Sequence, residues 1–367
     1  EFKPGDNYQS KLLHDYQNTL QYTGLFTTVS IKPSLTQKNI SHEVPIYLDY
    51  EPIQKVQYKL GVGYNTDTKL NTSLGFTRNR LGMRGEKLNA ELHASSRRTS
   101  VQANLFIPSS HPKFDYYSLE AEYANEMIID DNNDQGFYLT LNHTKIHNFG
   151  ASHFFDSQTS LIYTLDWSKA EDSPTIRTQV VYPKIQYQYI FKSLDKTIQA
   201  TLGTEISGNI AFFLSDISFL KTILYSNIRT AEIHNLRLIV KNKFGLIVSD
   251  DTPPLAWYFR TGGTYTVRGF EYESIGETEL TDNKMLFTHT TEVQHKLIES
   301  FFLATFFDCG NASENVFTTP TSQAIGTGLV WESPFGDIEV SVAWPLENYS
   351  IDQDNYKFHI ALKKGFY

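Results

Sequence analysis

Strict alternation of large apolar residues with small or polar ones begins at Val56-Gln57-Tyr58-Lys59-Leu60-Gly61-Val62-Gly63-Tyr64. A period of two is the pattern of a β-strand with one apolar face and one polar face. The alternation returns in Leu70–Phe76 and continues to the end of the chain. From residue 53 to residue 367 the pattern predicts about 16 strands, roughly one in every 20 residues, and almost no helix.

The remaining strands are predicted to follow one another with short gaps. They centre on Leu88–Leu92, Val101–Leu105 and Tyr117–Tyr123, and then lie near 134–147, 150–168, 176–192, 197–207, 216–228, 232–247, 284–298, 301–309, 322–333, 335–345 and 355–367. The interval 249–283 is the one long interruption. Long structureless intervals in compact domains are usually functional or disordered.

Aromatic residues are abundant although the chain is polar on average. It holds 25 Phe, 22 Tyr and 4 Trp, yet its mean hydropathy is −0.36, and no run reaches the roughly 18 apolar residues of a membrane helix. This combination is typical of a transmembrane β-barrel, whose strands alternate and whose interfaces carry aromatic girdles. A large soluble β-protein alternates in the same way, but it would more often divide into sandwiches joined by linkers.

The sequence therefore predicts an all-β transmembrane fold, a 16-stranded antiparallel outer-membrane barrel over residues 52–367. A closed barrel pairs every backbone group within lipid, which an open sheet cannot do. With about 16 strands the lumen is wide enough to hold water. The barrel is therefore either a pore or filled by a plug, and residues 249–283 are the predicted inward-folded plug.

Charge and cysteine content exclude several other classes of protein. The formal charge is −9 and no basic patch is visible, which argues against a nucleic-acid partner. A single cysteine, Cys309, rules out an internal disulfide. We expect no enzymatic activity, cofactor or metal, because the most clustered histidines match no metal or hydrolase motif. We interpret them as lumen or loop residues: His143, His147 and His153, near Asp156 and Ser157.

The long interval contains Gly262-Gly263-Thr264-Tyr265-Thr266-Val267-Arg268-Gly269-Phe270-Glu271-Tyr272. Its glycines allow backbone conformations closed to other residues. A lone arginine among apolar neighbours favours a planar partner such as a carboxylate. The alternative is a surface loop with a solvated arginine.

A carboxylate of this kind occurs 40 residues later, in Phe306-Phe307-Asp308-Cys309-Gly310. Counting by two places Phe306, Asp308 and Gly310 on one face of a strand, with apolar residues on the other. Since a carboxylate facing lipid would cost up to a few kcal/mol, Asp308 is predicted to face the lumen and to be a partner for Arg268. Alternatively, it is one of many polar lumen residues.

Together, Thr266-Val267-Arg268-Gly269-Phe270 and Phe306-x-Asp308-x-Gly310 resemble the outer-membrane assembly-factor superfamily, which includes BamA, TamA and the two-partner-secretion transporters. Gly326–Gly336 and Ala343–Leu346 match its penultimate strands. The resemblance implies that the sixth extracellular loop, after the eleventh strand, folds into the lumen. Val267, Arg268, Gly269 and Phe270 would form its anchored tip, and Phe306, Asp308 and Gly310 the wall that it contacts. Within the superfamily the compact barrel looks most like the TamA branch.

The resemblance also implies a weakly paired seam between the first and last strands that can open laterally. Gly61 and Gly63 on the first strand and Phe358, Ile360, Gly365 and Tyr367 on the last would border it. Alternatively, the glycines relieve crowding in the lumen. Tyr367 departs from the Phe that usually ends such barrels.

The first 51 residues predict a helix followed by two strands. A capping box is expected at Asp6–Gln9, a helix end at Gly24, and strands at 26–31 and 44–50. Phe2–Tyr8, Leu20, Thr23–Phe26 and Val29 resemble the C-terminal part of a POTRA domain, a periplasmic α+β module, without its first strand and helix. No signal peptide is visible, and the abrupt start indicates a processed or trimmed piece.

The resemblance implies a non-enzymatic factor in the bacterial outer membrane, with its POTRA part in the periplasm. It would act on unfolded outer-membrane proteins or autotransporters, in contact with membrane lipid and with an inner-membrane-anchored, TamB-like partner. The alternative is a two-partner-secretion exporter that moves a protein through the lumen. A passive porin is a third possibility, but it would have no need of a POTRA domain.

Overall fold

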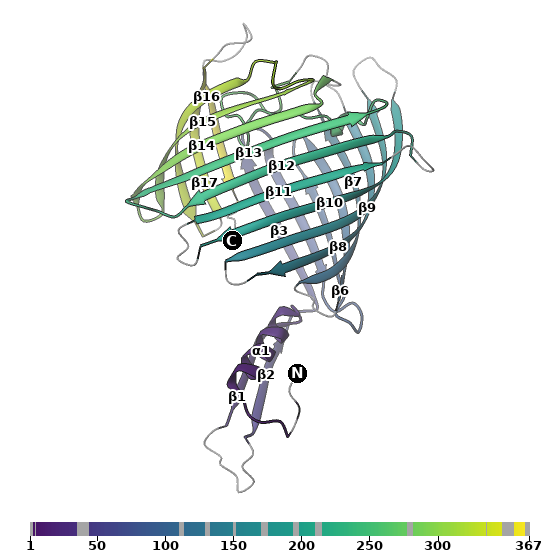
Figure 1. Ribbon diagram of the computed structural model, residues 1–367, viewed down its shortest axis with the longest axis vertical. Coiled ribbons are helices and arrows are strands. Elements are labelled where there is room, and N and C mark those ends of the chain that lie inside the picture. Colours follow the sequence, from purple (N-terminus) through teal and green to yellow (C-terminus); the bar gives the residue numbers. More distant parts are fainter. Residues whose placement is uncertain are drawn as a thin grey trace.

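In the described part of the chain, sixteen antiparallel strands close into a barrel in the computed structural model (Figure 1). The structure describes residues 3, 5–34, 44–109, 114–128, 133–149, 152–169, 175–193, 198–209, 215–276, 282–334, 336–346 and 356–363. In chain order the barrel strands are β3 (Val56–Asn65), β4 (Lys69–Arg78), β5 (Lys87–Ala94), β6 (Arg98–Pro108), β7 (Asp115–Met127), β8 (Asn133–Asn148), β9 (His153–Lys169), β10 (Ile176–Lys192), β11 (Ile198–Asn209), β12 (Phe219–Thr230), β13 (Leu236–Ser249), β14 (Met285–Ile298), β15 (Phe301–Ser313), β16 (Ser322–Ser333), β17 (Gly336–Pro345) and β18 (Lys357–Lys363).

Each barrel strand pairs with its neighbours in sequence, and β18 pairs with β3 to close the ring. The predicted fold class is therefore confirmed, as is the position of the long loop after the eleventh barrel strand, β13. One predicted boundary was too short. Strand β15 runs to Ser313 rather than to residue 309, so Gly310 lies inside the strand.

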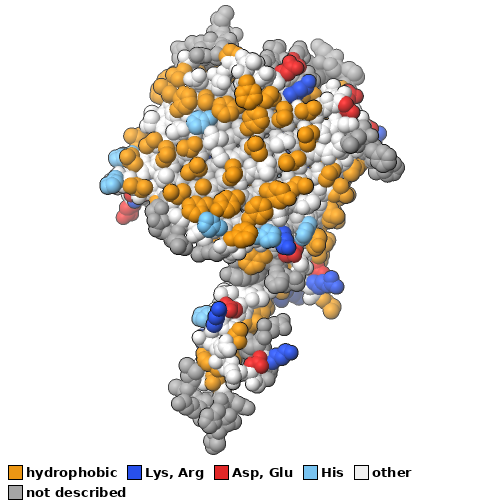
Figure 2. Space-filling model, in the orientation of Figure 1, with side chains coloured by type: hydrophobic (Ala, Val, Ile, Leu, Met, Phe, Trp, Pro, Cys, Tyr) orange, Lys and Arg blue, Asp and Glu red, His pale blue; other side chains and the backbone are white. Residues whose placement is uncertain are grey.

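The two faces of the barrel wall follow the alternation in the sequence. On β3 the side chains of Tyr58, Leu60 and Val62 are 80%, 76% and 64% exposed, whereas on β14 the polar Thr290 and Glu292 are buried on the inner face. Figure 2 shows hydrophobic side chains spread over the outer face of the barrel, with most of the charged side chains in view near its rims and on the N-terminal unit. This is the distribution of a barrel with an apolar environment outside and a polar interior.

The wall is uneven in height. Strands β8, β9 and β10 contain 16, 17 and 17 residues, whereas β3 and β4 contain 10 each and β5 contains 8. Among the fully described strands, the wall is therefore short on the β3 side of the junction of β18 with β3, on the other side of the ring from β8–β10.

The N-terminal unit consists, among its described residues, of α1 (Ser10–Tyr22), β1 (Phe26–Pro33) and β2 (Ile46–Pro52), with β1 and β2 paired antiparallel. The predicted capping box is wrong, because the N-cap is Gln9 and no side chain caps the helix. The Asp6 carboxylate instead accepts a hydrogen bond from the backbone N–H of Lys3 at 2.7 Å. Gly24 ends the helix as predicted, with φ +63°.

Short polar contacts join this unit to the barrel. The linker carbonyls of Ile53 and Gln54 accept hydrogen bonds from Arg80 and Asn79, which follow β4, at 3.2 and 2.9 Å. These contacts fix the start of β3 against the β4–β5 turn. Within the described residues, none of the helices has the length and apolar character to cross a membrane.

Candidate functional site

The described part of the loop between β13 and β14, residues 250–276 and 282–284, contains four buried aromatic side chains, those of Trp257, Tyr258, Phe259 and Phe270. A 3-10 helix, η1 (Leu255–Trp257), lies near its start, and the buried side chains of the loop pack in three clusters with residues of the barrel strands and with Ile217, which precedes β12. Trp257 packs with Val180, Ile217 and Phe219; Phe259 with Ile247, Leu286 and Ala312; Val267, Phe270 and Ile275 with Ala324. The loop is therefore a packed plug and not a strand-to-strand connection on the surface.

At the tip of this plug, Arg268 is 3% exposed and its guanidinium faces Asp308 on β15. The Nε and Nη2 groups donate to the two carboxylate oxygens of Asp308 at 2.7 and 3.1 Å, and the backbone N–H of Arg268 donates to the same carboxylate at 3.1 Å. The guanidinium also lies 3.3 Å from the centroid of the Phe306 ring. This is the planar, two-pronged recognition that arginine provides and lysine does not.

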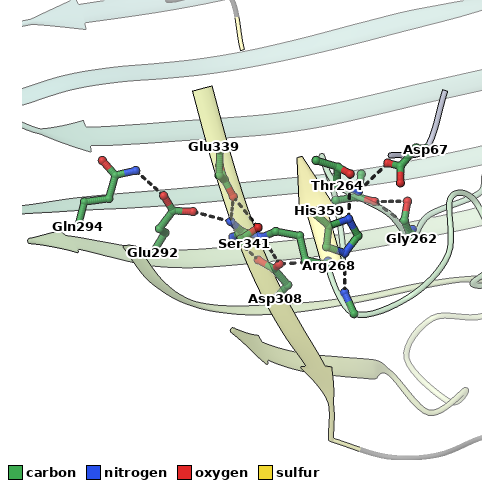
Figure 3. Close-up of polar contacts among 12 residues, drawn as sticks. Asp67, Gly262, Thr264, Arg268, Glu292, Gln294, Asp308, Glu339, Ser341 and His359 are labelled. Carbon is green, nitrogen blue, oxygen red and sulfur yellow. Dashed lines mark hydrogen bonds and ion pairs between the residues drawn. The ribbon is translucent and has the colours of Figure 1, made fainter. Parts of the chain in front are cut away.

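Two further carboxylates share this guanidinium. Its Nη1 group donates to Glu292 on β14 at 2.8 Å and to Glu339 on β17 at 2.9 Å (Figure 3). Gln294 donates to the other oxygen of Glu292, and Ser341 donates to Glu339 at 3.2 Å. Burial by itself would lower the pKa of the Arg268 guanidinium, but the charge and hydrogen bonds of Asp308, followed by Glu292 and Glu339, raise that pKa above its usual value. Arg268 therefore stays charged and joins three wall strands.

Two glycines allow the tip and the wall to approach each other. Gly269 has φ +99°, and a Cβ there would lie 2.9 Å from the Cβ of Ala324. A Cβ on Gly310 would lie 2.8 Å from the Cγ2 atom of Val267. The structure thus brings the predicted tip residues Val267 and Arg268 together with the predicted wall residues Phe306, Asp308 and Gly310. The other two predicted tip residues, Gly269 and Phe270, lie against Ala324 of β16.

The same tip also contacts both sides of the junction between the last and first barrel strands. On one side, the backbone N–H of Gly269 donates to Nε2 of His359 on β18 at 3.2 Å, and the Thr264 hydroxyl lies 2.9 Å from Nδ1 of the same ring. On the other side, the N–H of Thr264 donates to Asp67 at 2.7 Å, and its hydroxyl lies 3.3 Å from that of Thr66. Thr66 and Asp67 belong to the turn between β3 and β4.

The junction itself is narrow. Among the described residues, Asn65 and Ala361 are the only register partners between β3 and β18, and the Thr66 N–H donates to the Ile360 carbonyl at 3.3 Å. We call this junction the seam. By comparison, β17 and β18 share seven register pairs, from Asp337↔Lys363 to Ala343↔Lys357.

The predicted seam residues occupy different surroundings. Gly61 and Gly63 pair with Ser73 and Asn71 of β4. A Cβ on Gly61 would lie close to the Ser73 hydroxyl, whereas a Cβ on Gly63 would meet nothing within 4 Å. Phe358 and Ile360 pair with Val342 and Val340 of β17. Gly365 and Tyr367 lie outside the described residues.

A second arginine extends the polar network along the inner face of β15. Arg237 on β13 donates from Nε to Gln294 at 2.8 Å and from Nη1 to Glu332 on β16 at 2.6 Å. Its guanidinium lies 4.2 Å from the centroid of the Phe302 ring. Phe302 precedes Phe306 by four residues on β15, so both arginines lie over aromatic rings of the same strand face.

One of the three clustered histidines, His143, was assigned to the wrong face. His143 shares the outward face of β8 with the exposed Leu139 and Leu141, stacks on Tyr117, and lies 3.0 Å from a carboxylate oxygen of Asp115. It is therefore an outer-face residue and not a lumen residue. Within the described ranges there is no group of three or more His, Cys, Asp or Glu side chains that could hold a metal ion.

Comparison with known proteins places this geometry among related barrels. The model of the Omp85 superfamily domain matches residues 54–366. The structure of BamA from Haemophilus ducreyi lacking POTRA domains 1–3 is similar, with a TM-score of 0.79 and 15% identity over 99% of this chain and 80% of that one. CdiB from Acinetobacter baumannii gives a TM-score of 0.63 and 16% identity over 98% of this chain and 69% of that one. CdiB from Escherichia coli gives 0.64 and 13%, over 98% and 72%.

Proposed function

Because this chain belongs to the Omp85 superfamily, an outer-membrane family of assembly and transport proteins that are not enzymes, we propose that it helps other β-barrel proteins or autotransporters to fold and insert into the outer membrane. The observation that carries the proposal is the seam, where β3 and β18 share one register pair in the described part of the chain.

The proposed mechanism is strand addition at the seam. From Val56 to Tyr64, β3 is paired along one edge with β4, while among the described residues its other edge meets β18 only at Asn65. Unpaired N–H and C=O groups on a strand edge bind an incoming strand, which gains backbone hydrogen bonds in an environment that has no water to supply them. An unfolded outer-membrane protein is a substrate that offers such strands.

The uneven wall supports the same mechanism. The strands on the β3 side of the seam, β3 to β5, contain 8 to 10 residues, whereas β8–β10 contain 16 or 17. A short hydrophobic wall thins the adjoining bilayer at a modest free-energy cost. Thinning next to the open strand edge would lower the barrier for a substrate strand to enter the membrane there.

We also propose that α1, β1 and β2 are the remainder of a periplasmic POTRA domain. The helix followed by an antiparallel strand pair supports this assignment, as does the short link to the barrel. Strand β2 is exposed throughout its length, which suits a module that binds partners by strand addition. The TamA-like subassignment, and with it an inner-membrane-anchored, TamB-like partner, is part of this proposal.

The test is to lock the seam. In a Cys309→Ser background, Asn65→Cys with Ala361→Cys places two thiols on the register partners of β3 and β18. The variant would be reconstituted in liposomes, and the protease-protected insertion of an unfolded outer-membrane barrel would be timed. Ala200→Cys with Ile228→Cys provides a matched control, because these are register partners of β11 and β12, away from the seam.

Oxidation is expected to abolish the acceleration of insertion in the seam variant, and reductant is expected to restore it, while the control is unaffected. A porin of equal strand number should not accelerate insertion at all. If the oxidised seam variant inserts substrate as fast as the reduced one, the lateral route is wrong. The alternative, an exporter that uses the lumen, would then be tested by measuring conductance and export with the seam locked.

A further inference from the structure

The plug tip contacts the barrel in two separate ways. Arg268 joins it to the wall strands β14, β15 and β17, whereas Thr264 and Gly269 join it to β18 and to the β3–β4 turn. The first set of contacts lies on one side of the seam, on β14, β15 and β17. The second set spans the seam, because one residue, Thr264, bonds to partners on both of its sides (Figure 3).

The N–H of Gly269 fixes the direction of the hydrogen bonds that join Gly269, His359 and Thr264. The N–H of Gly269 can only donate, so Nε2 of His359 must accept. The neutral ring then carries its proton on Nδ1 and donates to the Thr264 hydroxyl. The hydroxyl proton of Thr264 remains available for the Thr66 hydroxyl, and the Thr264 N–H donates to Asp67. The result is a continuous chain from β18 through the plug to the β3–β4 turn.

Among the described residues, this chain of hydrogen bonds lies where two neighbouring barrel strands share the fewest register pairs. The backbone contributes the Asn65↔Ala361 pair and the bond from Thr66 to Ile360. The turn residue that makes this backbone bond, Thr66, also contacts Thr264. Thr264 and the His359 ring that it contacts are each 3% exposed. Buried hydrogen bonds of this kind are costly to leave unmade.

We propose that Thr264, His359, Asp67 and Thr66 form a clasp by which the plug loop holds the seam closed. The seam opens when the clasp parts, while Arg268 and Asp308 keep the plug on the wall. The inference concerns the seam of the proposed function, but its test measures a hydrogen bond and not insertion, so either proposal can fail without the other.

The test is residue-resolved hydrogen exchange of the whole chain in lipid nanodiscs. The Thr66 amide reports on the seam because it donates to Ile360, and the Arg268 amide reports on the anchor because it donates to Asp308. Thr264→Val removes the clasp hydroxyl and keeps the side-chain shape. Thr266→Val is the matched control, since the Thr266 hydroxyl bonds to the N–H and carbonyl of Gly262 within the loop.

Thr264→Val is expected to speed exchange of the Thr66 amide about fivefold or more and to leave the Arg268 amide unchanged. Asp67→Ala should do the same from the other side of the seam, and Thr264→Ser should retain slow exchange. Unchanged Thr66 exchange in both Thr264→Val and Asp67→Ala would overturn the clasp. So would equal acceleration of both amides, or an equal effect of Thr266→Val, because Thr264 would then support the plug rather than the seam.

Discussion

Arg268 and Asp308 are 40 residues apart in the chain, yet the guanidinium of one and the carboxylate of the other meet through two hydrogen bonds of 2.7 and 3.1 Å. Both side chains are almost completely buried. The pair fixes the tip of a lumen loop to the barrel wall, and its energetics can be tested by substitution.

Arg268→Ala is expected to lower the free energy of unfolding by about 3–5 kcal/mol. Removing the cation leaves the buried carboxylates around it without a compensating charge. Urea unfolding in detergent micelles, followed by tryptophan fluorescence, measures the change. Arg268→Lys keeps the charge but loses the planar fork, so it should fall between Ala and the parent. Arg84→Ala, at an exposed turn position, is the control and should change the free energy little. Equal stability of Arg268→Ala and Arg84→Ala would contradict the anchor.

The three carboxylates around Arg268 are not expected to contribute equally. Asp308 accepts three hydrogen bonds from Arg268, whereas Glu292 and Glu339 each accept one from its Nη1 group. Asp308→Asn should therefore destabilise the protein more than Glu339→Gln, which also relieves repulsion among like charges. The same urea unfolding experiment measures both variants. A larger loss of unfolding free energy in Glu339→Gln than in Asp308→Asn would refute this ranking.

Gly310→Ala is expected to destabilise the anchored loop by about 1–3 kcal/mol, because the added methyl group overpacks the site. The methyl group would lie 2.8 Å from Val267 and 3.0 Å from the Phe287 carbonyl. Val267→Ala removes one of these contacts, so the double variant should lose less than the sum of the two single losses. A double-mutant cycle tests this, and strict additivity would show that the two residues do not interact.

Arg237→Met is expected to be tolerated better than Arg268→Met. Arg237 bonds to the neutral Gln294 and to Glu332, whose side chain is 34% exposed and also paired with Arg229, so its loss leaves no isolated buried charge. Methionine can also keep a contact with the Phe302 ring. Comparison of the two unfolding midpoints provides the test. The reverse order would indicate that the Arg237 network, and not the Arg268 anchor, dominates stability.

Local patterns in the sequence predict the barrel well. Alternation places Tyr58, Leu60 and Val62 outside, and it places Asp308 inside, because successive side chains of a strand point to opposite faces. The same rule could have corrected the assignment of His143, since this residue is in step with the apolar residues Leu139 and Leu141. The N-cap was misplaced because Asp6 has a competing backbone partner in Lys3, which no spacing rule takes into account.

The other partners at the site could not be predicted in this way. Glu292, Glu339 and His359 are each recognisable as inward-facing, but many other residues are too. Which of them meet at the loop tip depends on the stagger of strands around the barrel and on the path of the loop through the lumen. These properties arise from closure of the whole ring, so no single stretch of sequence contains them.

The contacts of Thr264 also constrain the order in which the molecule folds. Thr264 follows Asp67 by 197 residues and precedes His359 by 95. Contacts so distant along the chain form slowly, because the entropy of closing long loops must be overcome first. The loop cannot reach its final position until the first and last hairpins have met, so docking of the loop and closure of the ring belong to one late step. Until that step, the edges of β3 and β18 are open to other copies of the chain, which makes the nearly finished barrel the intermediate most prone to aggregate.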